Sequence, residues 1–153
     1  MLFVETTKAL LGAGCFWGIE EYFRKIYGIN NTLVGYSGGD LINPSYQDVC
    51  KDTTGHVEVV LVEFNEKIIS YSKILDHFWT CHDPTQPNGQ GYDIGTQYKS
   101  VIFYYSSEQK NIAEKSKYEF QKNTHAPIIT EIKRAKEFYI AEDYHQCYIQ
   151  KKG

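Results

Sequence analysis

The segment GAGCFWG, residues 12–18, places a cysteine between glycines and two large aromatic side chains. The residues before it have the pattern of a strand and those after it the pattern of a helix, so we expect Cys15 at the first turn of that helix. Free amides and the positive end of the helix dipole stabilise a thiolate there, which predicts a lowered pKa for Cys15 and a nucleophilic sulfur. A small, buried and unreactive cysteine is the alternative interpretation.

Glu58 is the second residue with chemical potential. Its strand, HVEVVLVEF, has two faces, which carry His56, Glu58, Val60, Val62 and Phe64 on one side and Val57, Val59, Leu61 and Glu63 on the other. A carboxylate in such a strand could simply reach the rim of the sheet. If it is buried instead, desolvation raises its pKa, and a protonated carboxyl beside a thiolate is a general-acid arrangement.

Three polar side chains lie in loops that could border a pocket. Tyr46 and Tyr98 lie in or beside glycine-rich segments, where a phenol can point into a pocket and donate a hydrogen bond. Either could equally be an exposed ring. Asp93, in GQGYDIG, is by itself best interpreted as a turn residue.

The sequence does not predict a metal site. Cys81 is followed by His82, and His145 lies two residues before Cys147, but neither spacing matches a common zinc site. No phosphate-binding loop and no dinucleotide fingerprint is present.

The elements that must position these residues alternate between strands and helices, which predicts an α/β layered domain. We expect strands at 7–14, 31–38, 56–64, 99–107 and 127–133, helices at 15–28, 69–84, 106–121 and 141–152, and loops at 38–49 and 83–98. The last helix of this set contains Cys147. No repeat, linker or low-complexity tract is present, so residues 1–153 are expected to form one domain.

Composition narrows the class of protein. The 153 residues are 42% hydrophobic and 23% charged, as in soluble globular domains, and a net charge of −3 without a basic stripe argues against nucleic-acid binding. The N-terminal residues lack the basic and apolar regions of a signal peptide, and no stretch is apolar enough to cross a membrane. Four scattered cysteines favour reduced thiols, so a cytoplasmic protein is expected.

Six motifs in order resemble a known family. They are GCFWG, GYSGG, NPSYQDVC, TGHVEV, HDPTQPNGQGYDIGTQYKS and FYIAEDYHQ, and together they resemble the A-type peptide methionine sulfoxide reductases from about Leu10 to Gln146. The resemblance implies an α+β fold, a two-layer sandwich with a ferredoxin-like plait, in which helices flank a mixed sheet and long loops form the active site.

The resemblance also implies a role for each matching residue. Cys15 would attack the sulfoxide sulfur, and Glu58 would protonate its oxygen. The substrate would be bound by Phe16 and Trp17 around its S-methyl group and by Tyr46, Asp93 and Tyr98 around its oxygen. Methionine would leave, and Cys15 would become a sulfenic acid.

Substrate, reductant and partners follow from the same resemblance. The substrate would be the S-epimer of methionine sulfoxide, free or in oxidised proteins, and neither a metal nor an organic cofactor would be required. Electrons would come from thioredoxin, glutaredoxin or another thiol. We expect a monomer that binds neither nucleic acid nor membrane.

The chain departs from the family pattern at its C-terminal end. Many members carry resolving cysteines in a glycine-rich tail, whereas here only Cys147 lies nearby, before the sequence ends at Gly153. Cys50 is a second contender, and Cys81 ranks last. We expect an external thiol to attack the sulfenic acid directly; resolution through a disulfide with Cys147 is the alternative.

Two other functions compete with this interpretation. A cysteine hydrolase would use Cys15 to attack an acyl carbon and would need a histidine near it as base, for which His56 on the Glu58 strand is available. A non-enzymatic protein would use the aromatic pocket only to bind methionine-rich partners.

Overall fold

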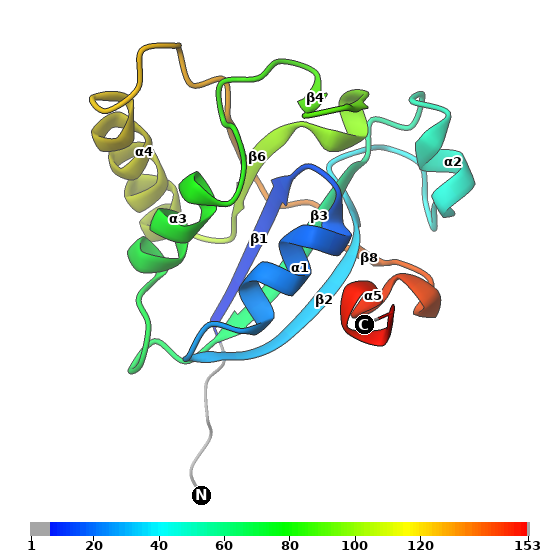
Figure 1. The fold of residues 1–153 in the computed structure, drawn as a ribbon, viewed down its shortest axis with the longest axis horizontal. Helices are drawn as coiled ribbons and strands as arrows, with labels where there is room; N and C mark the ends of the chain where they lie inside the picture. The colour runs from blue at the N-terminus through cyan, green and yellow to red at the C-terminus, as the bar shows by residue number, and fades with distance from the viewer. Residues whose placement is uncertain (1–6, 153) are drawn as a thin grey trace, which may run out of the picture.

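The computed structural model describes residues 7–152 (Figure 1). Its elements, in chain order, are β1 (Thr7–Ala13), α1 (Phe16–Arg24), β2 (Ile29–Ser37), α2 (Tyr46–Cys50), β3 (Val57–Phe64), α3 (Tyr71–Thr80), β4 (Gly89–Gln90), β5 (Asp93–Ile94), the 3-10 helix η1 (Thr96–Tyr98), β6 (Ser100–Tyr104), α4 (Ser107–Gln121), β7 (Glu131–Arg134), β8 (Tyr139–Ile140), the 3-10 helix η2 (Asp143–His145) and α5 (Tyr148–Lys152).

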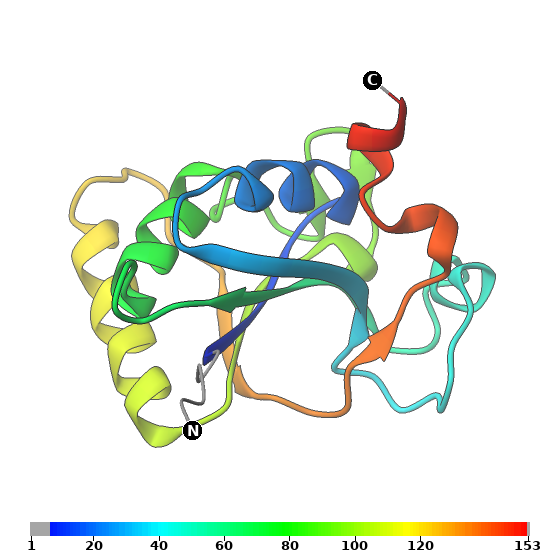
Figure 2. The same ribbon diagram turned by 90° about the horizontal axis from the view of Figure 1, so that it is seen from below.

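Six strands form one mixed sheet in the order β7-β6-β1-β3-β2-β8. The β6–β7 pair is parallel and the other pairs are antiparallel. The elements β1, α1, β2, β3, α3 and β6 follow the β-α-β-β-α-β connection of a ferredoxin-like unit, and helices pack on one face of the sheet (Figures 1 and 2). The expected two-layer α+β sandwich is therefore confirmed.

Strand β3 is central and buried on both faces, as its apolar pattern predicts. The side that faces the helices contributes Val60, Val62 and Phe64 to the main core. The opposite side contributes Val57, Val59 and Leu61 to a smaller cluster, against which Phe138 packs from the segment between β7 and β8. The predicted division of the two faces is confirmed.

Two helix starts show how local sequence sets the elements. Ser106 caps α4 by accepting a hydrogen bond from the Gln109 amide at 3.1 Å. Helix α2 was missed, because four of its five residues lie in a segment that we expected to be a loop. Its start is a capping box in which Ser45 and Asp48 each accept a hydrogen bond from the other's amide, and this pair was the available signal.

Helix α1 ends at Arg24 rather than at Gly28, because the chain must turn there into β2. Gly28 makes that turn with φ +104°, a conformation that favours glycine.

The predicted helix at 141–152 is also wrong in part. It is divided into η2 and α5, and Cys147 lies between them with φ +49°. Two contacts that sequence does not show cause the interruption. The Gln146 side chain bonds to Val34 on the edge of β2, and the Cys147 amide donates to Glu20 at 2.7 Å.

The long loop at 83–98 contains more structure than expected. It includes the two-stranded hairpin β4–β5 and the turn η1. His82 anchors its start, since its Nε2 accepts from Ser100 of β6 at 2.7 Å while its Nδ1–H donates to Phe78 at 2.7 Å. Among residues 7–152, no helix is long and apolar enough to cross a membrane.

Candidate active site

Cys15 is the N-cap residue of α1, directly after β1, so its expected place at the helix start is confirmed. Gly14 turns the chain between the two elements with φ +98°. A Cβ atom at Gly14 would lie 2.9 Å from the Gln90 side chain, so glycine also lets the β4–β5 hairpin approach the cysteine. The sulfur thus lies where a helix start and a loop hairpin meet.

Glu58 is buried, with 1% of its surface exposed, so the interpretation that it reaches the sheet rim is wrong. The Phe16 amide donates to its Oε1 at 3.2 Å, and the Gln97 side-chain amide donates to its Oε2 at 3.1 Å. Because Phe16 directly follows Cys15, the first of these bonds holds the carboxyl beside the start of α1.

Burial raises the pKa of Glu58 to about 7, although the donors Phe16 and Gln97 favour the ionised form and lower it. The negative charge of Asp93 adds to the upward shift. A carboxyl with this pKa can gain and lose a proton near neutral pH, which is the property a general acid needs.

The pKa of Cys15 behaves differently from the sequence expectation. It is raised to about 11, mainly by burial and also by the negative charges of Glu58 and Asp93, whereas the amides of Trp17 and Gly18 lower it. The helix start therefore acts in the predicted direction, but desolvation outweighs it. Without substrate, the sulfur is a thiol at neutral pH.

Aromatic rings form one wall beside Cys15. Phe16 is buried and Trp17 half-buried, both on the first turn of α1. The Trp17 indole donates to Nδ1 of His145 at 2.9 Å and stacks on Tyr148 with ring centres 3.9 Å apart. His145 also lies 4.6 Å from the Tyr46 ring. The C-terminal segment thus lies against α1 and completes the wall (Figure 2).

Glu142 ties this C-terminal segment to the opposite side of the site. Its carboxylate accepts from the Tyr36 hydroxyl and from the Tyr46 amide, each at 3.0 Å. Tyr46 is the first residue of α2, so this contact fixes the start of that helix. A phenol from α2 is thereby held near the aromatic wall.

The remaining predicted polar residues surround the carboxyl. Tyr98 ends η1, and burial together with the charges of Glu58 and Asp93 raises its pKa to about 12. Burial and the Cys50 thiol raise the pKa of Tyr46, so both phenols remain hydrogen-bond donors at neutral pH. Asp93 is exposed on β5, and its charge acts on both Cys15 and Glu58.

Cys147 contacts α1 more than one helical turn beyond Cys15. Its amide bonds to Glu20, and its side chain lines a groove with Arg24 and the start of β2. Glu20 lies five residues beyond Cys15, or about 7.5 Å along a helix that rises 1.5 Å per residue. All four cysteines carry free thiols.

Sequence reasoning missed Gln97 and His145 as site residues. Gln97 carries no charge and lies between Asp93 and Tyr98, the two residues of this segment that were considered as site residues. His145 was considered only as a metal ligand. Both lie inside quoted motifs, GTQYKS and AEDYHQ, and that was the signal that could have found them.

The contacts of His56 decide whether it can act as a base. The Gly39 amide donates to Nδ1 of His56 at 3.1 Å, and Nε2–H donates to the Leu41 carbonyl at 2.7 Å. Both ring nitrogens are therefore occupied, and His56 is not free to act as a base for Cys15. Within the described part of the chain, no three His, Cys, Asp or Glu side chains cluster as metal ligands.

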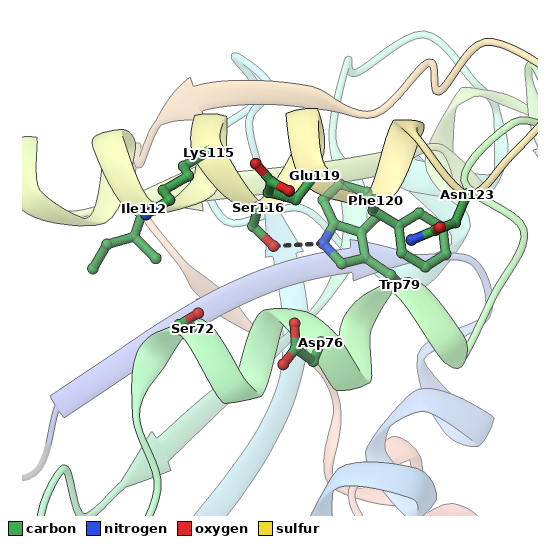
Figure 3. A pocket seen from close by; sticks show the side chains of 9 residues that line it. All are labelled: Ser72, Asp76, Trp79, Ile112, Lys115, Ser116, Glu119, Phe120 and Asn123. Carbon is green, nitrogen blue, oxygen red and sulfur yellow. Dashed lines mark hydrogen bonds between the residues drawn. The ribbon is translucent and has the colours of Figure 1, made fainter.

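A separate groove of about 520 Å³ lies between α3 and α4 (Figure 3). Trp79 forms part of it, donating from its indole to Ser116 at 2.8 Å and stacking on Phe120. It is lined by Ser72, Asp76, Trp79, Ile112, Lys115, Ser116, Glu119, Phe120 and Asn123. None of these residues belongs to the Cys15 site, and the indole bond joins the two helices.

Comparison with known proteins shows the family of the chain. Residues 7–153 match the family model described as peptide methionine sulfoxide reductase. A relative from Methanococcus maripaludis, "Peptide methionine sulfoxide reductase MsrA", is 51% identical over 148 residues, which cover 97% of this chain and 94% of the relative.

Solved structures give the same result. Mxr1 from Saccharomyces cerevisiae in reduced form superposes with a TM-score of 0.92 at 38% identity, covering 96% of this chain and 86% of that chain. Mxr1 in complex with Trx2 superposes with a TM-score of 0.68 at 26% identity, covering 97% of this chain and 90% of that chain.

Proposed function

The chain belongs to the peptide methionine sulfoxide reductase family, and from this membership we propose that Cys15 and Glu58 form the catalytic pair of a thiol-dependent enzyme that reduces methionine S-sulfoxide to methionine. The observation that carries the proposal is the buried Glu58 carboxyl, held by the amide of the residue after Cys15. It puts an acid with a pKa of about 7 beside a nucleophilic sulfur.

The reductive step balances without a further reactant. A sulfoxide sulfur is a poor electrophile until its oxygen accepts a proton, so Glu58 supplies that proton while the Cys15 thiolate attacks the sulfur. The attack forms a bond between the two sulfurs, and the protonated oxygen leaves the substrate sulfur as hydroxide. When that hydroxide adds to the Cys15 sulfur, the bond between the two sulfurs breaks, the thioether departs and Cys15 becomes a sulfenic acid. Overall, one thiol and one sulfoxide give one thioether and one sulfenic acid.

In the reactive protonation state, Cys15 and Glu58 together hold one proton. A thiol is a weak nucleophile, so this proton must reside on Glu58 while Cys15 is ionised. The free protein holds one proton in total between about pH 7, where Glu58 ionises, and about pH 11, where Cys15 does. A sulfoxide oxygen that accepts a hydrogen bond from the protonated Glu58 favours the reactive arrangement of that proton.

The pocket suits one epimer of the substrate. Phe16 and Trp17 provide apolar surfaces for the S-methyl group, and the phenols of Tyr46 and Tyr98 can donate to the oxygen. With the methyl group and oxygen fixed in this way, the rest of the methionine chain has one direction left. Asp93 is exposed, and its charge acts on Cys15 and Glu58.

Only the S-sulfoxide should therefore be consumed from a racemic mixture, so that about half of the substrate remains when dithiothreitol is in excess. Chiral chromatography of free methionine sulfoxide, followed over time, measures this. Equal consumption of the two epimers would show that Phe16 and Trp17 do not orient the methyl group. No turnover of either epimer would contradict the proposed function itself.

We propose that a thioredoxin-like or glutaredoxin-like dithiol reduces the sulfenic acid directly. The relative Mxr1 is known in complex with Trx2, which supports a partner of the thioredoxin type. Cys147 is tied through its amide to Glu20, more than one helical turn beyond Cys15. A reducing cytoplasm would supply such thiols, and the pocket needs residues from one chain only, which is consistent with a monomer.

Thiol counting after one equivalent of methionine sulfoxide, without reductant, tests this route. One thiol should be lost, because the sulfenic acid of Cys15 finds no internal partner. A disulfide with Cys147 would require its sulfur to reach bonding distance, with Cα atoms roughly 4.4–6.8 Å apart. Loss of two thiols, with a Cys15–Cys147 or Cys15–Cys50 peptide found by mass spectrometry, would overturn the direct route. Cys147→Ser and Cys50→Ser variants identify which of the two is involved.

A further inference from the structure

We propose that Gln97 is a positioning residue that aims the Glu58 carboxyl at the substrate oxygen and tunes how readily it gives up its proton. This inference rests on the proposed acid role of Glu58. Gln97 acts through that carboxyl, and it needs no contact with the substrate.

Gln97 is buried, with 4% of its surface exposed, in the middle of η1. Its Nε2 donates to Oε2 of Glu58 at 3.1 Å and to the Cys50 sulfur at 3.6 Å. An ionised carboxylate can only accept hydrogen bonds, so the amide nitrogen, rather than the oxygen, must face Glu58. Both hydrogens of this nitrogen then have an acceptor.

The two donors determine where the acidic proton can go. The Phe16 amide serves one carboxyl oxygen of Glu58, and Gln97 serves the other. Neither nitrogen can accept a hydrogen bond in return. When Glu58 is protonated, its O–H must therefore find an acceptor elsewhere, and a sulfoxide oxygen bound beside Cys15 provides one.

The backbone around Gln97 is fixed from two sides. The Gly95 amide donates to Asn88 at 2.8 Å, which ties η1 to the start of the β4–β5 hairpin. Both the amide and the hydroxyl of Thr96 donate to Asp52, in the segment after α2. Gln97 is thus held in place by neighbours that do not themselves touch Glu58.

The titratable groups that face Glu58 come from five elements. They are Cys15 before α1, Tyr36 on β2, Tyr46 on α2, Asp93 on β5 and Tyr98 on η1. Of these, Asp93 acts on Glu58 to raise its pKa, and the bond from Gln97 opposes that effect. Removing the amide donor should therefore raise the pKa of Glu58 further.

Gln97→Met tests the inference, because methionine matches glutamine in length but lacks the donor. The readout is kcat/KM against pH, whose acid limb marks the pH at which the Cys15–Glu58 pair loses the first of its two protons. This limb should move upward by about one pH unit, as expected for one lost hydrogen bond to a charged group. The plateau should fall by about tenfold or more, because the carboxyl is less well aimed.

Gln109→Met is the matched control. Gln109 is also buried, at 7% exposed, and it bonds to Lys8 and Tyr105 away from the site. The same chemical change there should leave the acid limb in place. Cys50→Ala should leave it in place as well, because the bond between Gln97 and Glu58 remains.

An acid limb that does not move in Gln97→Met would overturn the inference, whether the plateau falls or not, since a fall alone would indicate only a packing role. Thermal unfolding confirms that the variant is folded, and Gln97→Leu with an isotope-edited infrared titration of Glu58 repeats the test if it is not. The Glu58→Gln variant distinguishes a failure of the proposed acid role of Glu58 from a failure of the proposed positioning role of Gln97. If that variant is fully active, the acid role itself fails; if it is inactive while Gln97→Met keeps the wild-type limb, only the role of Gln97 fails.

Discussion

Cys15→Ser should abolish reduction of methionine sulfoxide while leaving the fold intact. A serine hydroxyl is not ionised at neutral pH and cannot replace the thiolate that attacks the sulfoxide sulfur. The side chain is partly exposed and caps α1 without a hydrogen bond of its own, so little packing is lost. Single-turnover formation of methionine, measured by chromatography, is the readout, and thermal unfolding checks the fold.

Cys81→Ser and Cys147→Ser are the matched controls for this variant. Both remove a thiol outside the proposed pair and should retain the single-turnover rate. Residual activity of Cys15→Ser within about tenfold of wild type, roughly 1.4 kcal/mol of barrier, would rule Cys15 out as the nucleophile. If the wild type itself never turned over but Cys15→Ser bound sulfoxide peptides, a binding protein would be the better interpretation.

Local patterns predicted the framework of this site well. The period-two pattern of residues 56–64 identified a strand and divided its residues correctly between two faces, and the glycines before Cys15 identified the turn into α1. Both features depend on neighbours in sequence. The ferredoxin-like sheet order came from the family resemblance, since strand order depends on contacts between distant residues.

Contacts between distant segments of the chain account for the features of the site that the sequence did not predict. The pKa of Cys15 was expected to fall, but the burial that raises it comes from segments far away in the chain. Cys147 was placed inside a helix, whereas Gln146 and the Cys147 amide bond to Val34 and Glu20 and break it. The hydrogen bond from Gln97 to Glu58 can be recognised only when η1 is placed against β3.

Glu58→Gln should slow formation of the sulfenic acid by about 10²-fold or more, because an amide of nearly the same size cannot deliver a proton. The acid limb of kcat/KM near pH 7 should also vanish. In the wild type this limb reflects Glu58 losing a proton as pH rises through its pKa of about 7. Without that carboxyl, only the ionisation of Cys15 at higher pH remains in the profile.

The substitution has a structural cost that a control must measure. The Phe16 amide and Gln97 both donate to Glu58, and a glutamine there leaves one donor facing another donor. Glu20→Gln makes the same change at another buried carboxylate, which accepts from Thr32 at 2.8 Å and from the Cys147 amide at 2.7 Å. It should lose stability to a similar degree yet keep both the rate and the acid limb. A single-turnover rate for Glu58→Gln equal to that of Glu20→Gln would transfer the acid role to a tyrosine or to water.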